Sequence, residues 1–407
     1  MVAETNSPKA ATIKRPRARV RIFKLVAILV GFGFALAVAE AGLRVVEKEA
    51  TPQTPRMVAD PVLGSRVAPN APGHDANGFR NSTAPAHADV VAIGDSQTWG
   101  VNAQMPDAWP QQLEKLSGQS VYNMSVGGYG PDQYSVLTEQ ALKLSPKTIV
   151  VGLYFGNDLY DAYSSAYELP SFADLRQAQP IRDLIQDTIR SRSEALWNDE
   201  KNFHNSYGRH SVSGWSIWLR EHTAIGRLLN RNGWWLGASD IDYEIDKEWA
   251  RVHPDHAAVC DDKNVRTVLT TAYRLTALDL DDTRIAEGLR ITKLTLGSIG
   301  QKTEGRANLF ILMIPTKELV YAEVMRHDGR LNGNYARVVE METKARQDVN
   351  SWCAENKIRC IDALPAMQSA IAQGRQLYPT SAESHPIGPG YAVIASVAND
   401  ALKTLPR

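Results

Sequence analysis

The sequence predicts an α/β fold, a three-layer α/β/α sandwich around a five-stranded parallel sheet. Short apolar runs rich in β-branched residues alternate along the chain with longer stretches of helical periodicity, which is typical of a parallel sheet covered by helices on both faces. Polar residues capable of chemistry follow directly on several of these runs, at the strand ends where open α/β sheets bind ligands. The expected strands are residues 90–93, 121–126, 148–153, 309–314 and 358–361.

Five helices are expected to alternate with these strands. The first lies between Pro110 and Gly118, and the positions of these two residues are typical of a helix start and a helix end. The last helix follows the final strand and closes the chain. The expected helices are residues 109–116, 133–144, 283–299, 338–353 and 391–402.

The N-terminus is typical of a segment that enters a membrane. Basic residues precede an uncharged apolar run at 25–39, as in a signal peptide or a signal anchor whose basic end stays in the cytoplasm. The run is short against the roughly 20 residues of a spanning helix, and Ala37–Ala39 would suit a cleavage site, but the apolar stretch continues to Leu43. We therefore expect a cytoplasmic tail at 1–24, an uncleaved transmembrane anchor at 25–43 and a stem at 44–77. The basic residues are Lys14, Arg15, Arg17, Arg19, Arg21 and Lys24.

Charge and cysteine content narrow the class of protein. Forty-five basic residues balance forty-five acidic ones, so charge does not indicate nucleic acid as a partner. Cys353 and Cys360 flank a short connection between a helix and a strand; they either form a disulfide in an oxidising compartment or remain two thiols, and Cys260 is left over. Neither the cysteines nor the histidines are spaced as in a metal site, and no cofactor is expected.

Four short motifs carry the chemistry. Gly-Asp-Ser at 94–96, Gly-Gly at 127–128 and Gly-Asn-Asp at 156–158 each follow an expected strand, and His385 lies near the C-terminus. Together they resemble the SGNH, or GDSL-type, hydrolase superfamily, whose signature residues are serine, glycine, asparagine and histidine in this order. The resemblance implies an SGNH-type, flavodoxin-like sheet. Segments that resemble a membrane-anchored bacterial branch of the superfamily are 77–80, 107–110, 129–133 and 314–318.

The resemblance assigns roles to these residues. Ser96 is the expected nucleophile and His385 the general base that takes its proton. The backbone N–H groups of Ser96 and Gly128 and the side chain of Asn157 are the expected oxyanion donors. Lys317, just after the fourth strand, is expected at the same edge, either in contact with substrate or exposed to solvent.

The orienting acid is where the sequence departs from the family pattern. The commonest pattern places an aspartate three residues before the histidine, and this chain has Ala382 there. Some branches place the acid two residues before, which is the position of Glu383. We expect Glu383 to orient the ring, with Asp362 at the end of the last strand as a weaker alternative.

Residues 161–280 show no recognisable motif and are expected to form a mostly helical insertion into an SGNH domain at 78–160 and 281–407. The insertion follows the Asn157 motif, so it should emerge beside the active site. It contains six of the nine tryptophans of the chain. Most should form a small core of its own, whereas Trp234 and Trp235 are candidates for binding substrate.

The sequence thus predicts a serine esterase that acts through an acyl-serine intermediate, single-pass in a bacterial inner membrane with its catalytic domain in the periplasm. The resemblance favours an O-acetyl esterase or acetyltransferase on envelope polysaccharide or exopolysaccharide. Two alternatives stay open. One is a lipase-like or thioesterase-like acyl hydrolase; the other is a non-catalytic assembly component that partners polysaccharide export proteins.

Overall fold

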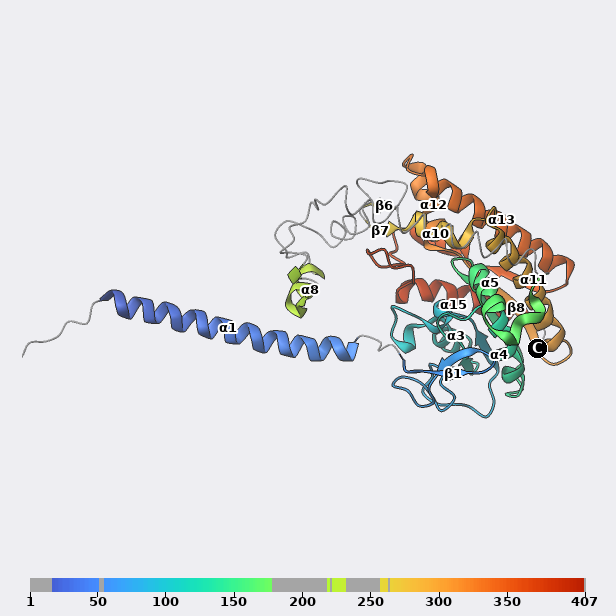
Figure 1. Ribbon diagram of the computed structural model, residues 1–407, viewed down its shortest axis with the longest axis horizontal. Coiled ribbons are helices and arrows are strands. Elements are labelled where there is room, and N and C mark those ends of the chain that lie inside the picture. Colours follow the sequence, from blue (N-terminus) through green and yellow to red (C-terminus); the bar gives the residue numbers. More distant parts are fainter. Residues whose placement is uncertain are drawn as a thin grey trace, which may run out of the picture. The chain divides into compact units, whose positions relative to one another are not determined.

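The computed structural model describes residues 17–50, 55–177, 218–219, 222–231, 257–262 and 264–405 (Figure 1). They fall into two compact units. One joins the N-terminus, up to residue 51, to residues 215–234, and the other comprises residues 52–214 and 235–407. The predicted insertion therefore contributes to both units.

The second unit is built on the predicted five-stranded parallel sheet, with strand order β4-β3-β5-β8-β9. Each strand coincides with an expected apolar run to within a few residues, so the predicted fold class is confirmed. The second strand is shorter than expected because the chain leaves the sheet after Asn123, whose side chain accepts a hydrogen bond from the Ser125 backbone N–H. The strands are β3 (Val90–Ile93), β4 (Val121–Asn123), β5 (Thr148–Tyr154), β8 (Asn308–Ile314) and β9 (Arg359–Asp362).

Helices cover both faces of this sheet and make the predicted three layers. Side chains alternate between the faces along a strand, so Val90 and Ala92 of β3 pack into one apolar core, and Val91 and Ile93 into the other. The first core includes residues of α3 (Trp109–Ser117), α12 (Lys317–His327), α14 (Leu364–Ala372) and α15 (Gly388–Lys403). The second includes residues of α4 (Pro131–Leu142), α11 (Thr283–Thr303) and α13 (Gly333–Glu355).

The segment predicted as a stem is largely part of the folded domain. Strands β1 (Met57–Asp60) and β2 (Gly64–Val67) form an antiparallel hairpin. The hydroxyl of Tyr129 donates to the carbonyl of Ser65 at 2.7 Å, and that of Tyr122 donates to the buried Asp75 carboxylate at 2.8 Å. The prediction of a stem over the whole of 44–77 was wrong because the composition of the segment does not reveal these contacts to β4 and to the loop after it.

The described parts of the insertion include a β-hairpin that the sequence did not predict. Strands β6 (Ala258–Asp261) and β7 (Arg266–Leu269) pair antiparallel, and helix α10 (Thr271–Leu278) follows them. At the other end, α5 (Asp158–Glu168) leads into a 3-10 helix, η2 (Pro170–Leu175). The substrate-binding candidates Trp234 and Trp235 lie outside the described residues.

The first unit contains one long helix, α1 (Arg17–Ala50), in which Arg21–Val45 is long and apolar enough to cross a membrane. A signal sequence meets the same criteria of length and composition. Within this unit, the carboxylate of Glu40 accepts hydrogen bonds from the backbone N–H groups of Ala224 and Ile225 at 2.9 and 3.0 Å. These two residues begin α8 (Ala224–Arg231), which thus lies against α1.

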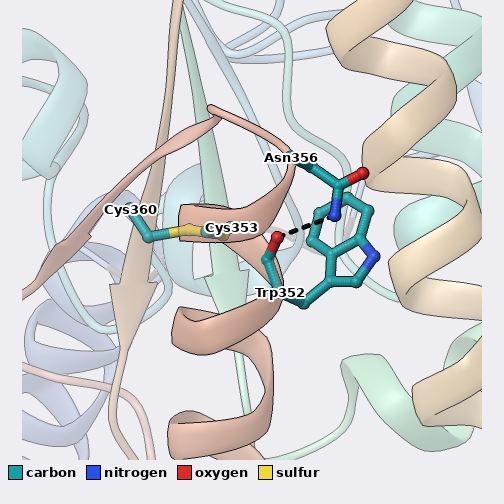
Figure 2. Close-up of a disulfide and its surroundings, with 4 residues drawn as sticks. All are labelled: Trp352, Cys353, Asn356 and Cys360. Atoms are coloured by element: carbon teal, nitrogen blue, oxygen red, sulfur yellow. Dashed lines mark hydrogen bonds between the residues drawn. A yellow bond between two sulfur atoms is a disulfide. The ribbon is translucent and has the colours of Figure 1, made fainter.

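A disulfide joins Cys353, near the end of α13, to Cys360 on β9 (Figure 2). Their Cα atoms lie 6.2 Å apart, and seven positions separate them in the sequence. Of the two alternatives that the spacing left open, the structure has the disulfide. Cys260 is a free, buried cysteine.

Candidate active site

The site lies where the strand order changes direction. The chain passes from β3 to β4 on one side and then to β5 on the other, so the loops after β3 diverge and leave a crevice. Such switch points are where open α/β sheets bind ligands. The motif at 94–96 follows β3 directly, and Ser96 is the first residue of the short helix α2 (Ser96–Trp99). The serine is therefore carried to the crevice by the central part of the sheet.

The turn that presents Ser96 depends on its neighbours. A Cβ atom at Gly94 would stand 2.2 Å from Thr98 Oγ1 of α2 and 3.1 Å from the carbonyl oxygen of Gly152 on β5, so the close approach of these two elements favours glycine. The side chain of Asp95 caps α2 by accepting from the backbone N–H of Gln97 at 2.9 Å. Burial raises the pKa of Asp95 above its ordinary value. These contacts fix the backbone on both sides of the serine.

His385 and Glu383 complete a triad with Ser96. His385 Nε2 lies 2.8 Å from Ser96 Oγ, and Nδ1 lies 2.5 Å from Glu383 Oε1. The same glutamate oxygen accepts the backbone N–H of His385 at 3.1 Å. The hydrogen bond from His385 lowers the pKa of Glu383 to about 2, against the raising effect of its partial burial. Glu383 is therefore an anion at neutral pH, able to hold the ring in one orientation.

The alternative acid, Asp362, is engaged elsewhere. Its carboxylate pairs with the guanidinium of Arg346 and accepts the backbone N–H of Leu364 at 2.7 Å. Between the two acids that the sequence offered, the structure brings Glu383 to the histidine.

Gly128 and Asn157 lie on the loops after β4 and β5, as the motifs predict. Gly128 has a positive φ of +81°, which favours glycine, and a Cβ placed there would meet nothing within 4 Å. A Cβ at neighbouring Gly127 would lie 3.6 Å from the Ser96 Cβ, so this loop runs beside the serine. Asn123, at the end of β4, joins the start of this loop to α2: its side-chain oxygen accepts from the backbone N–H of Ser125 at 3.2 Å, and its amide donates to the carbonyl of Thr98 at 3.1 Å.

The Asn157 side chain is held by a carboxylate. Asn157 is the N-cap residue of α5, and its Nδ2 donates to Asp161 Oδ2 at 2.6 Å. Burial, followed by the nearby Asp95, raises the pKa of Asp161 to about 7. One proton of the amide thus has a fixed partner, and the orientation of the amide group is set before any ligand binds.

The structure buries Lys317 among protein partners. The side chain is fully buried, and its Nζ donates to main-chain oxygens that include those of Val268 and Glu383, at 2.6 and 3.0 Å. The expectation of an exposed or substrate-binding lysine was wrong. Strand β8 ends at the predicted edge, but the lysine side chain binds hairpin β6–β7, which was not predicted from the sequence.

Several supporting residues were not predicted from the sequence. Asn102 donates to the main-chain oxygen of His385 at 3.1 Å, and Arg274 donates to the main-chain oxygen of Gly156. Both side chains bond to backbone groups of the motifs, so a motif search has no signal for them. Among the described residues, no group of three or more His, Cys, Asp or Glu side chains is arranged to hold a metal ion.

No protein-family model matches the sequence, and no curated protein matches it. Several solved structures are similar to the chain. A member of the lipolytic protein G-D-S-L family from Veillonella parvula has 10% identity and a TM-score of 0.35, over 78% of this chain and 98% of the other. Phospholipase A1 from Streptomyces albidoflavus has 13% identity and a TM-score of 0.37, over 77% and 99%. A catalytic mutant of an acetylxylan esterase from Geobacillus stearothermophilus has 10% identity and a TM-score of 0.33, over 77% and 94%.

Proposed function

We propose that this chain is an SGNH-type serine ester hydrolase. The observation that carries the proposal is the hydrogen-bonded series from Ser96 Oγ to His385 Nε2 and from His385 Nδ1 to Glu383, at the switch point of the sheet. A serine hydroxyl is a weak nucleophile until a base takes its proton. A histidine at 2.8 Å whose other nitrogen contacts a carboxylate meets that need.

The reaction has two halves. Ser96 Oγ attacks the ester carbonyl carbon while its proton passes to His385 Nε2, and the resulting oxyanion is stabilised by the N–H groups of Ser96 and Gly128 and by the amide of Asn157. The carbon–oxygen bond to the alcohol then breaks, and the alcohol leaves with the proton from Nε2. Water, or a second alcohol, attacks the acyl-serine with the same base, and the acyl group departs as the acid or as a new ester.

The proposed substrate is an O-acetyl ester on envelope polysaccharide or exopolysaccharide. Export from the cytoplasm would bring the enzyme to such polymers. Two features support export. Segment Arg21–Val45 is apolar enough to cross a membrane and follows a basic N-terminus. The Cys353–Cys360 disulfide is of a kind that persists in oxidising compartments. Lipid or thioester hydrolysis by the same machinery is the second candidate, favoured if the anchor holds the site near lipid.

Labelling with a fluorophosphonate tests the proposed function without knowledge of the substrate, because the probe reacts only with an activated serine. The full-length protein in detergent should be labelled at one residue, Ser96, and the label should be absent from Ser96→Ala. Mass spectrometry of the labelled peptide identifies the position. An unlabelled, folded wild type would favour the alternative of a non-catalytic assembly component of a polysaccharide export system.

The proposed location is tested by fusions to the C-terminus. If the basic tail stays inside and the catalytic unit is exported, a C-terminal alkaline phosphatase should be active, and a fluorescent protein that folds only in the cytoplasm should be dark. The opposite pair of results would exclude a periplasmic enzyme. N-terminal sequencing of the mature chain separates an anchor from a signal peptide, since cleavage after Ala39 would leave Glu40 as the first residue.

A further inference from the structure

Two adjacent charged residues of the 314–318 segment, Lys317 and Glu318, occupy the first turn of α12 and are fully buried. Burying charge costs free energy unless polar partners compensate for the lost water. The helix does not need these charges for its cap, because Thr316 serves as the N-cap by accepting from the backbone N–H of Leu319 at 3.1 Å. The binding partners of the two side chains therefore indicate why charged residues are buried at these positions.

Lys317 binds the loop that carries the acid and the base. Its Nζ lies 3.1 Å from the carbonyl oxygen of Ser381 and 3.0 Å from that of Glu383. It also donates to the carbonyl of Val268 at 2.6 Å and lies 3.3 Å from Thr267 Oγ1, both on β7. One buried ammonium thus ties the loop that carries Glu383 and His385 to strand β7.

Glu318 supports the turn that carries Asn157, the proposed side-chain donor to the oxyanion. Its Oε1 accepts the backbone N–H of Thr270 at 3.1 Å, and its Oε2 lies 3.5 Å from Nε of the buried Arg274. Arg274 Nη1 in turn donates to the carbonyl of Gly156 at 2.5 Å, directly before Asn157. The ion pair therefore fixes the turn from which the Asn157 side chain projects.

We propose that Lys317 and Glu318 are positioning residues that hold two segments of the active site, the loop of the acid and base and the turn of the oxyanion donor, in their relative places. Lys317 holds the loop of Glu383 and His385. Glu318, through Arg274, holds the turn of Asn157. This assignment rests on the proposed function, because it concerns the alignment of the groups that carry out the proposed reaction.

Substitutions of the two residues should change the pH dependence of the rate in different ways. Two carboxylates face His385: Glu383 from its own loop and Asp95 from the start of α2. A neighbouring carboxylate stabilises the protonated ring, so displacing Glu383 should move the acid limb of the pH profile to lower pH, while Asp95 stays in place. Displacing the Asn157 turn removes oxyanion stabilisation and should leave the acid limb unmoved.

The test is the pH dependence of the rate of fluorophosphonate labelling, measured on the full-length protein in detergent. Lys317→Met keeps the length of the side chain and removes the donors; we expect a rate about 10²-fold lower, as for a misplaced catalytic group, with the acid limb shifted to lower pH. Glu318→Gln should lower the rate by less than the about 10²-fold loss of a whole oxyanion donor, with the acid limb of the wild type.

Further variants keep the test decisive if Lys317→Met does not fold. Thr267→Val removes the hydroxyl that donates to the carbonyl of Pro379 at 2.8 Å, on the same loop, and should shift the acid limb in the same direction by a smaller amount. Thr303→Val is the matched control, because it removes a buried hydroxyl that donates within α11; it should behave as wild type.

The outcomes separate the positioning roles from the proposed function. An unlabelled wild type refutes the proposed function and this assignment with it. A labelled wild type whose folded Lys317→Met or Thr267→Val variant keeps the wild-type rate and acid limb overturns the positioning role alone. In these two variants a lower rate with an unmoved acid limb overturns the role of Lys317 as well, since that pattern indicates a general loss of packing. For Glu318→Gln, a wild-type rate or a shifted acid limb overturns the role of Glu318.

Discussion

Replacing Ser96 by alanine is expected to lower the rate of ester hydrolysis by about a thousandfold or more, and His385→Ala should do the same. The first change removes the nucleophile and the second the base that lies 2.8 Å from it. Because the two act as one unit, the double variant should be little slower than either single one. Hydrolysis of p-nitrophenyl acetate by the full-length protein in detergent measures all three rates.

Glu383→Ala belongs to the same series of variants. It should lower the rate of ester hydrolysis by less, because the carboxylate orients the imidazole ring and does not react. The pKa of Glu383 is lowered to about 2, so lowering the pH from neutrality toward 4 does not protonate it. Glu383 should therefore keep its charge and its orienting role over that range, and a fall in rate there would not come from its protonation. Asp362→Ala is the matched control for the acid, since Asp362 pairs with Arg346.

Melting curves must show that each variant is folded before rates are compared. Turnover near that of the wild type in folded Ser96→Ala would refute the proposed mechanism. If Glu383→Ala were unaffected and Asp362→Ala slow, the assignment of the orienting acid would be wrong.

Asn157→Ala should lower kcat by about 10²–10³ with little change in KM, because the amide stabilises charge that develops only in the transition state. The hydrogen bond from Asn157 Nδ2 to Asp161 fixes the amide in advance, so no reorganisation is needed during the reaction. Steady-state kinetics with p-nitrophenyl acetate separates the two parameters. Asn356→Ala serves as the control, since this exposed amide donates to the carbonyl of Trp352 beside the disulfide (Figure 2).

A rise in KM with unchanged kcat in Asn157→Ala would contradict the oxyanion role and would indicate ground-state binding instead. A lower kcat in Asn356→Ala as well would indicate that losing a surface amide disturbs the fold.

The sequence by itself determined the sheet, the order of its strands along the chain and the motif residues at their ends. These features depend on local signals, namely runs of β-branched apolar residues and glycines at turns, which are present within a few neighbouring positions. Val90–Ile93 and the serine that follows them needed no knowledge of the rest of the molecule.

Only the tertiary structure decided what depends on contacts between distant segments. Glu383 and Asp362 are both acids near the end of the chain, and only the path of the last loop shows which one meets His385. The burial of Lys317 depends on hairpin β6–β7, about fifty residues upstream, whose short strands carry no strong periodic signal. Hydropathy and spacing describe a residue and its neighbours in sequence, whereas burial and hydrogen bonding are set by whatever the folded chain brings against it.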